Sequence, residues 1–150
     1  MKNLLLSLLF INLFTSTLSA VDATLKIEKD VEQRARIALM DGSSEPSSKV
    51  FDILLSDLKI SGHFLPDSTH HIGDTASNYI IPALKSQEYV IKYSIDQRSG
   101  AKFLVRLLKA SDGTQIFKKS YAIPKKAKMP FLIHKAISDI NNILKYPSIS

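Results

Sequence analysis

Residues 88–123 decide the fold, and they read EYVIKYSIDQRSGAKFLVRLLKASDGTQIFKKSYAI. Large side chains at the start of this stretch alternate with smaller or polar ones, and they are Tyr89, Ile91, Tyr93 and Ile95. This two-residue period is typical of a strand with one buried face. Residues 98–100 (RSG) are turn-forming, and residues 103–109 (FLVRLLK) indicate a second strand. The stretch therefore predicts a three-stranded antiparallel meander.

The turn between the last two strands is predicted from Asp112-Gly113. This dipeptide favours a two-residue type I′ turn, because both central positions of that turn need a positive φ. Counting back from the turn places Leu108 opposite Phe117 and Leu104 opposite Tyr121. The predicted register thus sets large apolar residues against each other across the ladder.

A buried strand and an amphipathic helix precede the meander. Residues 35–40 (ARIALM) form a short apolar run, consistent with a buried strand. A helix is predicted from Ser47 or Ser48 to about Ser61, with its apolar stripe at four-residue spacing. Three residues define that stripe: Val50, Leu54 and Leu58. Gly62 is expected to end the helix in the left-handed conformation.

Two more helices complete the predicted order of elements. Residues 76–87 are consistent with a short helix, which Pro82 would distort. Pro130 is expected to open a final helix, since proline is tolerated in the first turn. Its apolar stripe consists of Ile133, Ile137, Ile140 and Leu144. This order predicts an α/β (α+β) fold, with two long helices packed on a mixed sheet of about five strands.

The first twenty residues have the features of a secretory signal peptide. Lys2 supplies a positive charge, residues 4–14 are almost all apolar, and small residues follow up to Ala20. Cleavage is expected after Ala20, with Ala23 as the alternative. The apolar run is too short to span a membrane securely, so the mature chain is expected to be exported and without a transmembrane segment. Absence of cysteine excludes disulfide scaffolds, thiol catalysis and an acylated lipoprotein.

Charge divides the mature chain into unlike halves. Residues 21–75 contain 10 acidic and 6 basic side chains, whereas residues 76–150 contain 4 acidic and 13 basic ones. A basic half suits nucleic acid, anionic lipid or an acidic protein. Export makes nucleic acid the least favoured of the three, so no nucleic-acid partner is expected.

No catalytic motif stands out in the sequence, and neither an enzyme nor a cofactor is predicted. His70 and His71 lie near Asp67 and Asp74, which suggests a metal hypothesis. Adjacent histidines on one loop rarely converge on an ion, so no metal site is predicted. His134, on the final helix, is expected to pack at the sheet edge.

Five lysines form the sharpest local charge feature: Lys118, Lys119, Lys125, Lys126 and Lys128. They fit a docking face for an acidic partner, anionic lipid or peptidoglycan. They also fit a strand edge whose lysines prevent edge-to-edge pairing, which is the commoner use of such residues.

Several motifs resemble those of the TolB family of the Tol-Pal system. Residues 57–64 (DLKISGHF) match D-L-x-x-S-G-x-F, and residues 106–113 resemble the family's R-L-x-D…G hairpin. Residues 134–140 (HKAISDI) are similar to its H-x-x-x-D-x-I helix. The sequence departs from the family where residues 89–93 lack a glycine. It departs again where Lys145-Tyr146-Pro147 replaces the glycine that ends the last helix.

The resemblance implies an anticodon-binding-domain-like α/β domain over residues 34–150, preceded by a partner-binding segment at residues 21–33. In the family this segment binds TolA, and a β-propeller that follows the domain binds Pal. The system links the two membranes, draws the outer membrane inward at division and is exploited in colicin import. Seven residues are implied to contact TolA: Val21, Asp22, Ala23, Thr24, Leu25, Lys26 and Ile27. Pal is expected as a partner only if a propeller follows residue 150.

From the residues alone, the segment has two readings of equal weight. Leu25 and Ile27 lie on one face of an alternating pattern, and Thr24 and Lys26 on the other. Such a segment suits either the first strand of its own domain or a strand added to another protein's sheet.

Overall fold

The computed structural model describes residues 33–96, 102–122 and 128–146. The elements reported below all belong to the unit that begins at Ala35. In chain order they are β1 (Ala35–Asp41), α3 (Ser48–Ile60), β2 (Phe64–Pro66), β3 (His71–Ile72), the 3-10 helix η1 (Pro82–Leu84), β4 (Tyr89–Asp96), β5 (Lys102–Lys109), β6 (Gln115–Ala122) and α4 (Met129–Ile143).

The strands form one mixed sheet in the order β2-β1-β4-β5-β6, with β3 also pairing with β1. β1 runs parallel to β2, β3 and β4. β4, β5 and β6 are antiparallel neighbours, as the meander predicts. The predicted fold class is confirmed. The sheet has six strands rather than about five, because the short β3 joins it.

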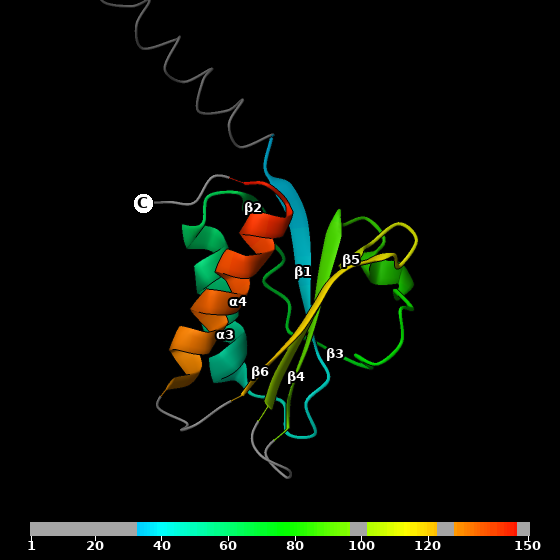
Figure 1. Cartoon of the computed structure of the whole chain (residues 1–150). Helices are drawn as coiled ribbons and strands as arrows, with labels where there is room; N and C mark the ends of the chain where they lie inside the picture. The colour runs from blue at the N-terminus through cyan, green and yellow to red at the C-terminus, as the bar shows by residue number, and fades with distance from the viewer. Residues whose placement is uncertain (1–32, 97–101, 123–127, 147–150) are drawn as a thin grey trace, which may run out of the picture. The chain divides into compact units, whose positions relative to one another are not determined.

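Both long helices cover one face of the sheet, as Figure 1 shows. The larger core lies between α3, α4 and this face, and it includes Ile37, Leu54, Tyr93, Phe103 and Ile140. The opposite face carries a smaller core, which is closed by η1 and its neighbours. Two buried faces explain why β1 is an almost continuous apolar run rather than an alternating one.

α3 begins and ends as its sequence predicts. The Ser47 hydroxyl oxygen accepts from the backbone N–H of Val50, which satisfies one of the unpaired donors of the first turn. Leu54 and Leu58 are fully buried against the sheet. Gly62 has a φ of 73°, so the left-handed helix end is confirmed.

The predicted helix over residues 76–87 is wrong, and only η1 forms there. Three carbonyl oxygens of residues 74–79 accept hydrogen bonds from the Lys92 ammonium, and the Arg106 guanidinium binds others. These carbonyls point into the sheet and are not available for helix hydrogen bonds. Pro82 lacks the N–H that a longer helix would need there.

The predicted register of the β5–β6 hairpin is also wrong. In the structure Leu107 pairs with Phe117 and Leu104 pairs with Ser120, one residue from the expected pairing, with an irregularity between Leu107 and Leu108. A type I′ turn needs a positive φ at both central residues, but only Gly113 of the pair has one. Residues 110–113 therefore form a longer loop, closed by the Lys109 N–H, which donates to the Thr114 carbonyl at 2.9 Å.

α4 confirms the predicted last helix, since Ile133, Ile137 and Ile140 are buried in the larger core. Its end is unusual because Lys145 has a φ of 59°. This is the left-handed position just beyond the helix, where glycine is favoured because it has no Cβ. Lysine therefore occupies a strained position.

Replacing Lys145 with glycine is expected to raise the free energy of unfolding by about 0.5 to 1 kcal/mol, the usual cost of this conformation for a residue with a Cβ. Urea unfolding at neutral pH measures the change. Lys145→Ala is the matched control, because it removes the charge and keeps the Cβ. Equal stability of the two variants would show that strain at this position is not the cause.

Candidate functional site

The structure places only part of the predicted site residues. Residues 21–27, Lys125 and Lys126 lie outside the described residues. Lys118 and Lys119 are successive residues of β6, so they point to opposite faces of the sheet. Lys128 immediately precedes α4.

The two adjacent histidines form separate pairs. Nε2 of His70 lies 3.1 Å from Oδ2 of Asp41, and Nε2 of His71 lies 2.9 Å from Oδ2 of Asp67. Among the residues that the structure describes, no group of three or more possible ligands could hold a metal ion.

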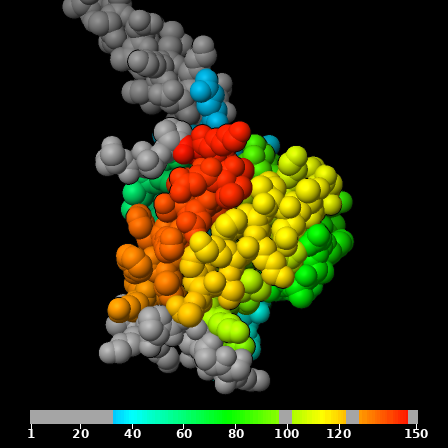
Figure 2. Space-filling view, viewed as in Figure 1, coloured from blue at the N-terminus to red at the C-terminus, as the bar shows by residue number. Residues whose placement is uncertain are grey.

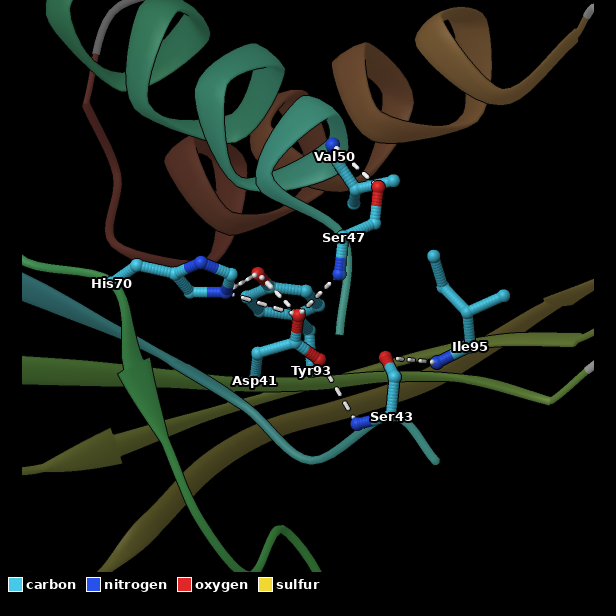
Figure 3. Close-up of polar contacts among 7 residues, drawn as sticks. All are labelled: Asp41, Ser43, Ser47, Val50, His70, Tyr93 and Ile95. Carbon is cyan, nitrogen blue, oxygen red and sulfur yellow. Dashed lines mark hydrogen bonds and ion pairs between the residues drawn. The ribbon is translucent and has the colours of Figure 1, made fainter. Parts of the chain in front are cut away.

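A polar cluster that the sequence analysis did not find lies at the carboxyl end of β1 (Figure 3). Asp41 ends β1, Tyr93 is its register partner on β4, and His70 lies just before β3. The Tyr93 hydroxyl donates to Oδ2 of Asp41 at 3.1 Å and lies 3.4 Å from Nε2 of His70. The carboxylate is buried, whereas the His70 side chain is 23% exposed.

Backbone groups complete the environment of the Asp41 carboxylate. Its Oδ1 accepts from the Ser43 N–H at 2.9 Å, and its Oδ2 accepts from the Ser47 N–H at 3.4 Å. The Ser43 hydroxyl accepts from the Ile95 N–H at 3.0 Å. One carboxylate thus ties together the end of β1, the start of α3 and the loop before β3 (Figure 3).

Hydrogen bonding sets the charge state of this cluster. Burial alone would raise the pKa of Asp41, but hydrogen bonds from Ser43, His70 and Tyr93 outweigh it and lower the pKa. Burial and the neighbouring carboxylate strongly raise the pKa of Tyr93, so the phenol stays protonated as a donor. The His70 ring stacks on Phe51 with centroids 4.5 Å apart. These groups satisfy one another, so the arrangement is best suited to holding three elements in place.

A second polar arrangement lies on the opposite face of the sheet. Lys92 is 1% exposed, and its Nζ donates to the carbonyls of Asp74, Ser77 and Tyr79 at 3.0, 3.0 and 2.7 Å. Burial lowers the pKa of Lys92, and nearby Asp74 partly offsets this effect. Three backbone carbonyls therefore accept hydrogen bonds from the buried ammonium in place of water.

Arg106 pairs with Lys92 across β4 and β5 and binds the same loop. Its Nη1 donates to the carbonyls of Thr75, Ala76 and Ser77, and its Nη2 donates to the Asn78 side chain. The exposed Asp74 carboxylate also stabilises the loop, because it accepts hydrogen bonds from the Ala76 and Ser77 N–H groups. Hydrogen bonds from Ser77 and Ala76 lower the pKa of Asp74 to about 2. Two buried cations thus fix the conformation of residues 74–79.

Comparison with known proteins identifies the family. The chain is 33% identical over 149 residues to the Tol-Pal system protein TolB of Wolinella succinogenes, a match that covers 95% of this chain and 35% of the relative. It is 28% identical over 162 residues to TolB of Helicobacter hepaticus, covering 97% of this chain and 35% of that protein. This chain belongs to the TolB family. It spans about a third of the length of these relatives, and it matches the family's amino-terminal domain.

A solved TolB structure shows the same fold. The crystal structure of TolB from Acinetobacter baumannii superposes with a TM-score of 0.59 at 20% identity, over 75% of this chain and 28% of that one. A scan against protein-family models finds no match. The resemblance to the TolB family that the motifs indicate is therefore confirmed.

Residues of the TolB motifs have structural roles in this domain, as a left-handed turn, a buried side chain and an anchor for a loop. Residues 57–64 contain the left-handed Gly62 and the buried Phe64, and Arg106 anchors residues 75–78. His134 is not packed at the sheet edge as expected. Its side chain is 76% exposed, and its Nδ1 lies 3.6 Å from Oδ2 of Asp57 on α3. Within the described ranges of this TolB domain, no helix is long and apolar enough to cross a membrane.

Proposed function

We propose that this chain is a non-enzymatic periplasmic interaction domain of the Tol-Pal system, which supports outer-membrane integrity and invagination at division. The observation that carries the proposal is its relationship to TolB over 95% of its length. Residues 1–20 act as the signal peptide, residues 21–33 as the partner-binding segment and residues 34–150 as the domain. Pal is a partner only where a propeller follows the domain.

Residues 21–33 bind TolA by adding a strand to its sheet. Leu25 and Ile27 supply two apolar anchors on one face, and backbone groups supply the ladder. One feature of the domain supports this role. β1 already has strand neighbours on both sides, β2 on one and β4 on the other.

Deleting Val21–Ile27 is expected to abolish binding of the TolA C-terminal domain while the domain stays folded. Calorimetry measures binding, and the thermal unfolding midpoint reports folding. Leu25→Asp is expected to weaken binding strongly, because it places a charge at an apolar anchor. Lys26→Ala is the control, since this residue points to the other face of the strand.

Two outcomes would contradict the proposal. Unfolding of the deletion variant would make the segment a structural strand of the domain. Normal TolA binding by the deletion variant, with loss of binding to anionic vesicles or peptidoglycan after charge reversal at Lys125, Lys126 and Lys128, would favour the lysine face instead.

A further inference from the structure

β6 forms an open edge of the described sheet. It is eight residues long, pairs with β5 on one side and has no described strand on the other. Figure 2 shows its yellow surface exposed beside the orange and red surface of α4. An edge strand presents unpaired N–H and C=O groups, and these can pair with an extended segment of another chain.

A row of three cations crosses the sheet and ends at this edge. Lys92 pairs with Arg106, and Arg106 pairs with Lys118, so the three side chains lie on the same face of neighbouring strands. The Lys92 ammonium and Nη1 of Arg106 donate to carbonyls of residues 74–79, and Nε of Arg106 donates to the Gln115 side chain on β6. Lys118 is exposed and has no ion-pair partner among the residues described. Like charges on adjacent strands repel, so an anion beyond Lys118 would stabilise the row.

On the other face of the edge strand, the nearby acidic residue is already paired. Asp139, the one acid in the sequence of β6 and α4, accepts from Lys119 at 2.7 Å and from the Tyr121 hydroxyl at 2.8 Å. Lys135 lies 3.6 Å from its second oxygen. The edge as a whole therefore presents positive charge.

We propose that β6 binds an extended acidic segment of another protein as an added strand, with an acidic side chain opposite Lys118. A second copy of this chain is a poor occupant, because pairing β6 with β6 would bring lysines together. A lipid surface fits poorly, because Lys118 and Lys119 point in opposite directions. This activity is independent of TolA binding by residues 21–27, since here the domain accepts a strand rather than donating one.

The test uses a synthetic peptide of alternating threonine and glutamate, long enough to pair with all of β6. Its glutamates lie on one face of a strand and can align with Lys118. We expect the peptide to slow hydrogen exchange of the β6 backbone amides in the full chain. Lys118→Glu should lower the affinity for the peptide about tenfold, because an attractive cross-strand pair becomes repulsive. The same variant should gain binding of the peptide with lysine in place of glutamate.

Lys109→Glu is the matched control, because it makes the same charge change at an exposed residue of β5, away from the edge. It should leave peptide affinity nearly unchanged. Equal weakening by Lys109→Glu would show that net charge alone attracts the peptide. Equal binding of a peptide of alternating proline and glutamate would exclude a backbone ladder. Lys118-dependent binding of anionic vesicles with no effect of the peptide would assign the edge to lipid. Each of these three results would overturn the proposal.

Discussion

Gly113→Ala is expected to lower the free energy of unfolding by about 3 kcal/mol or more, the sum of backbone strain and steric overlap. Gly113 has a φ of 74°, which disfavours any residue with a Cβ. An added Cβ would also overlap the backbone carbonyl of Asn78. The loop that contains Asn78 cannot easily move away, because Lys92 and Arg106 both donate hydrogen bonds to its Ser77 carbonyl.

Gly62→Ala separates the two causes. Gly62 has a φ of 73°, close to that of Gly113, but a Cβ added there would meet no atom within 4 Å. It should therefore cost only about 1 kcal/mol, the strain of the left-handed conformation. Urea unfolding of both variants measures the difference. Equal losses would show that the loop near Asn78 yields to the new methyl group.

Asp41→Asn is expected to cost about 2 to 4 kcal/mol at neutral pH, since it disrupts hydrogen bonds to a buried charge. The carboxylate accepts from Ser43, Ser47 and Tyr93. An asparagine side chain has the same shape, but its NH₂ group would face donors instead of accepting from them. Thermal and urea unfolding measure the loss. Asp52→Asn, on the exposed side of α3, should change stability by less than about 0.5 kcal/mol.

The effect of Asp41→Asn should depend on pH in a defined direction. The pKa of Asp41 is lowered in the folded state, so its carboxylate contributes stability above the pKa of an unfolded aspartate, near 3.8. That contribution is lost as the pH falls through the folded pKa. The stability difference between the parent chain and Asp41→Asn should therefore be greatest near neutral pH and decrease in acid. A difference independent of pH would show that the charge of Asp41 is not the stabilising feature.

Local periodicity explains which elements could be predicted. β4 and α3 have one face against the larger core, so their apolar residues repeat at the strand or helix period. β1 was predicted because a strand buried on both faces is continuously apolar. End signals were equally local, since Ser47 caps α3 and Gly62 ends it.

Non-local polar contacts explain what could not be predicted. The Asp41 cluster joins pairs of residues that are separated by 29 and by 52 positions in the chain. A single sequence offers no signal for such pairs. Lys92 and Arg106 occupy strand positions that look solvent-exposed by alternation, yet both are buried beneath residues 74–79. The same two cations explain why the predicted helix over residues 76–87 does not form, because they bind carbonyls that would accept its backbone hydrogen bonds. A charged residue that ends an apolar strand, as Asp41 does, is the one cue that could have indicated the cluster.

β1 is an inner strand of the sheet, and β4, the strand with which it pairs over the most residues, follows late in the chain. β1 precedes all three of its strand neighbours in the chain, and β4 begins only at Tyr89. A polypeptide delivered amino end first therefore presents Ala35–Asp41 well before its main partner has emerged. β4, β5 and β6 can close afterwards through hairpins between consecutive strands, which form faster than distant pairings. A chaperone that holds extended apolar segments would accordingly contact β1 for longer than it contacts the strands of the meander.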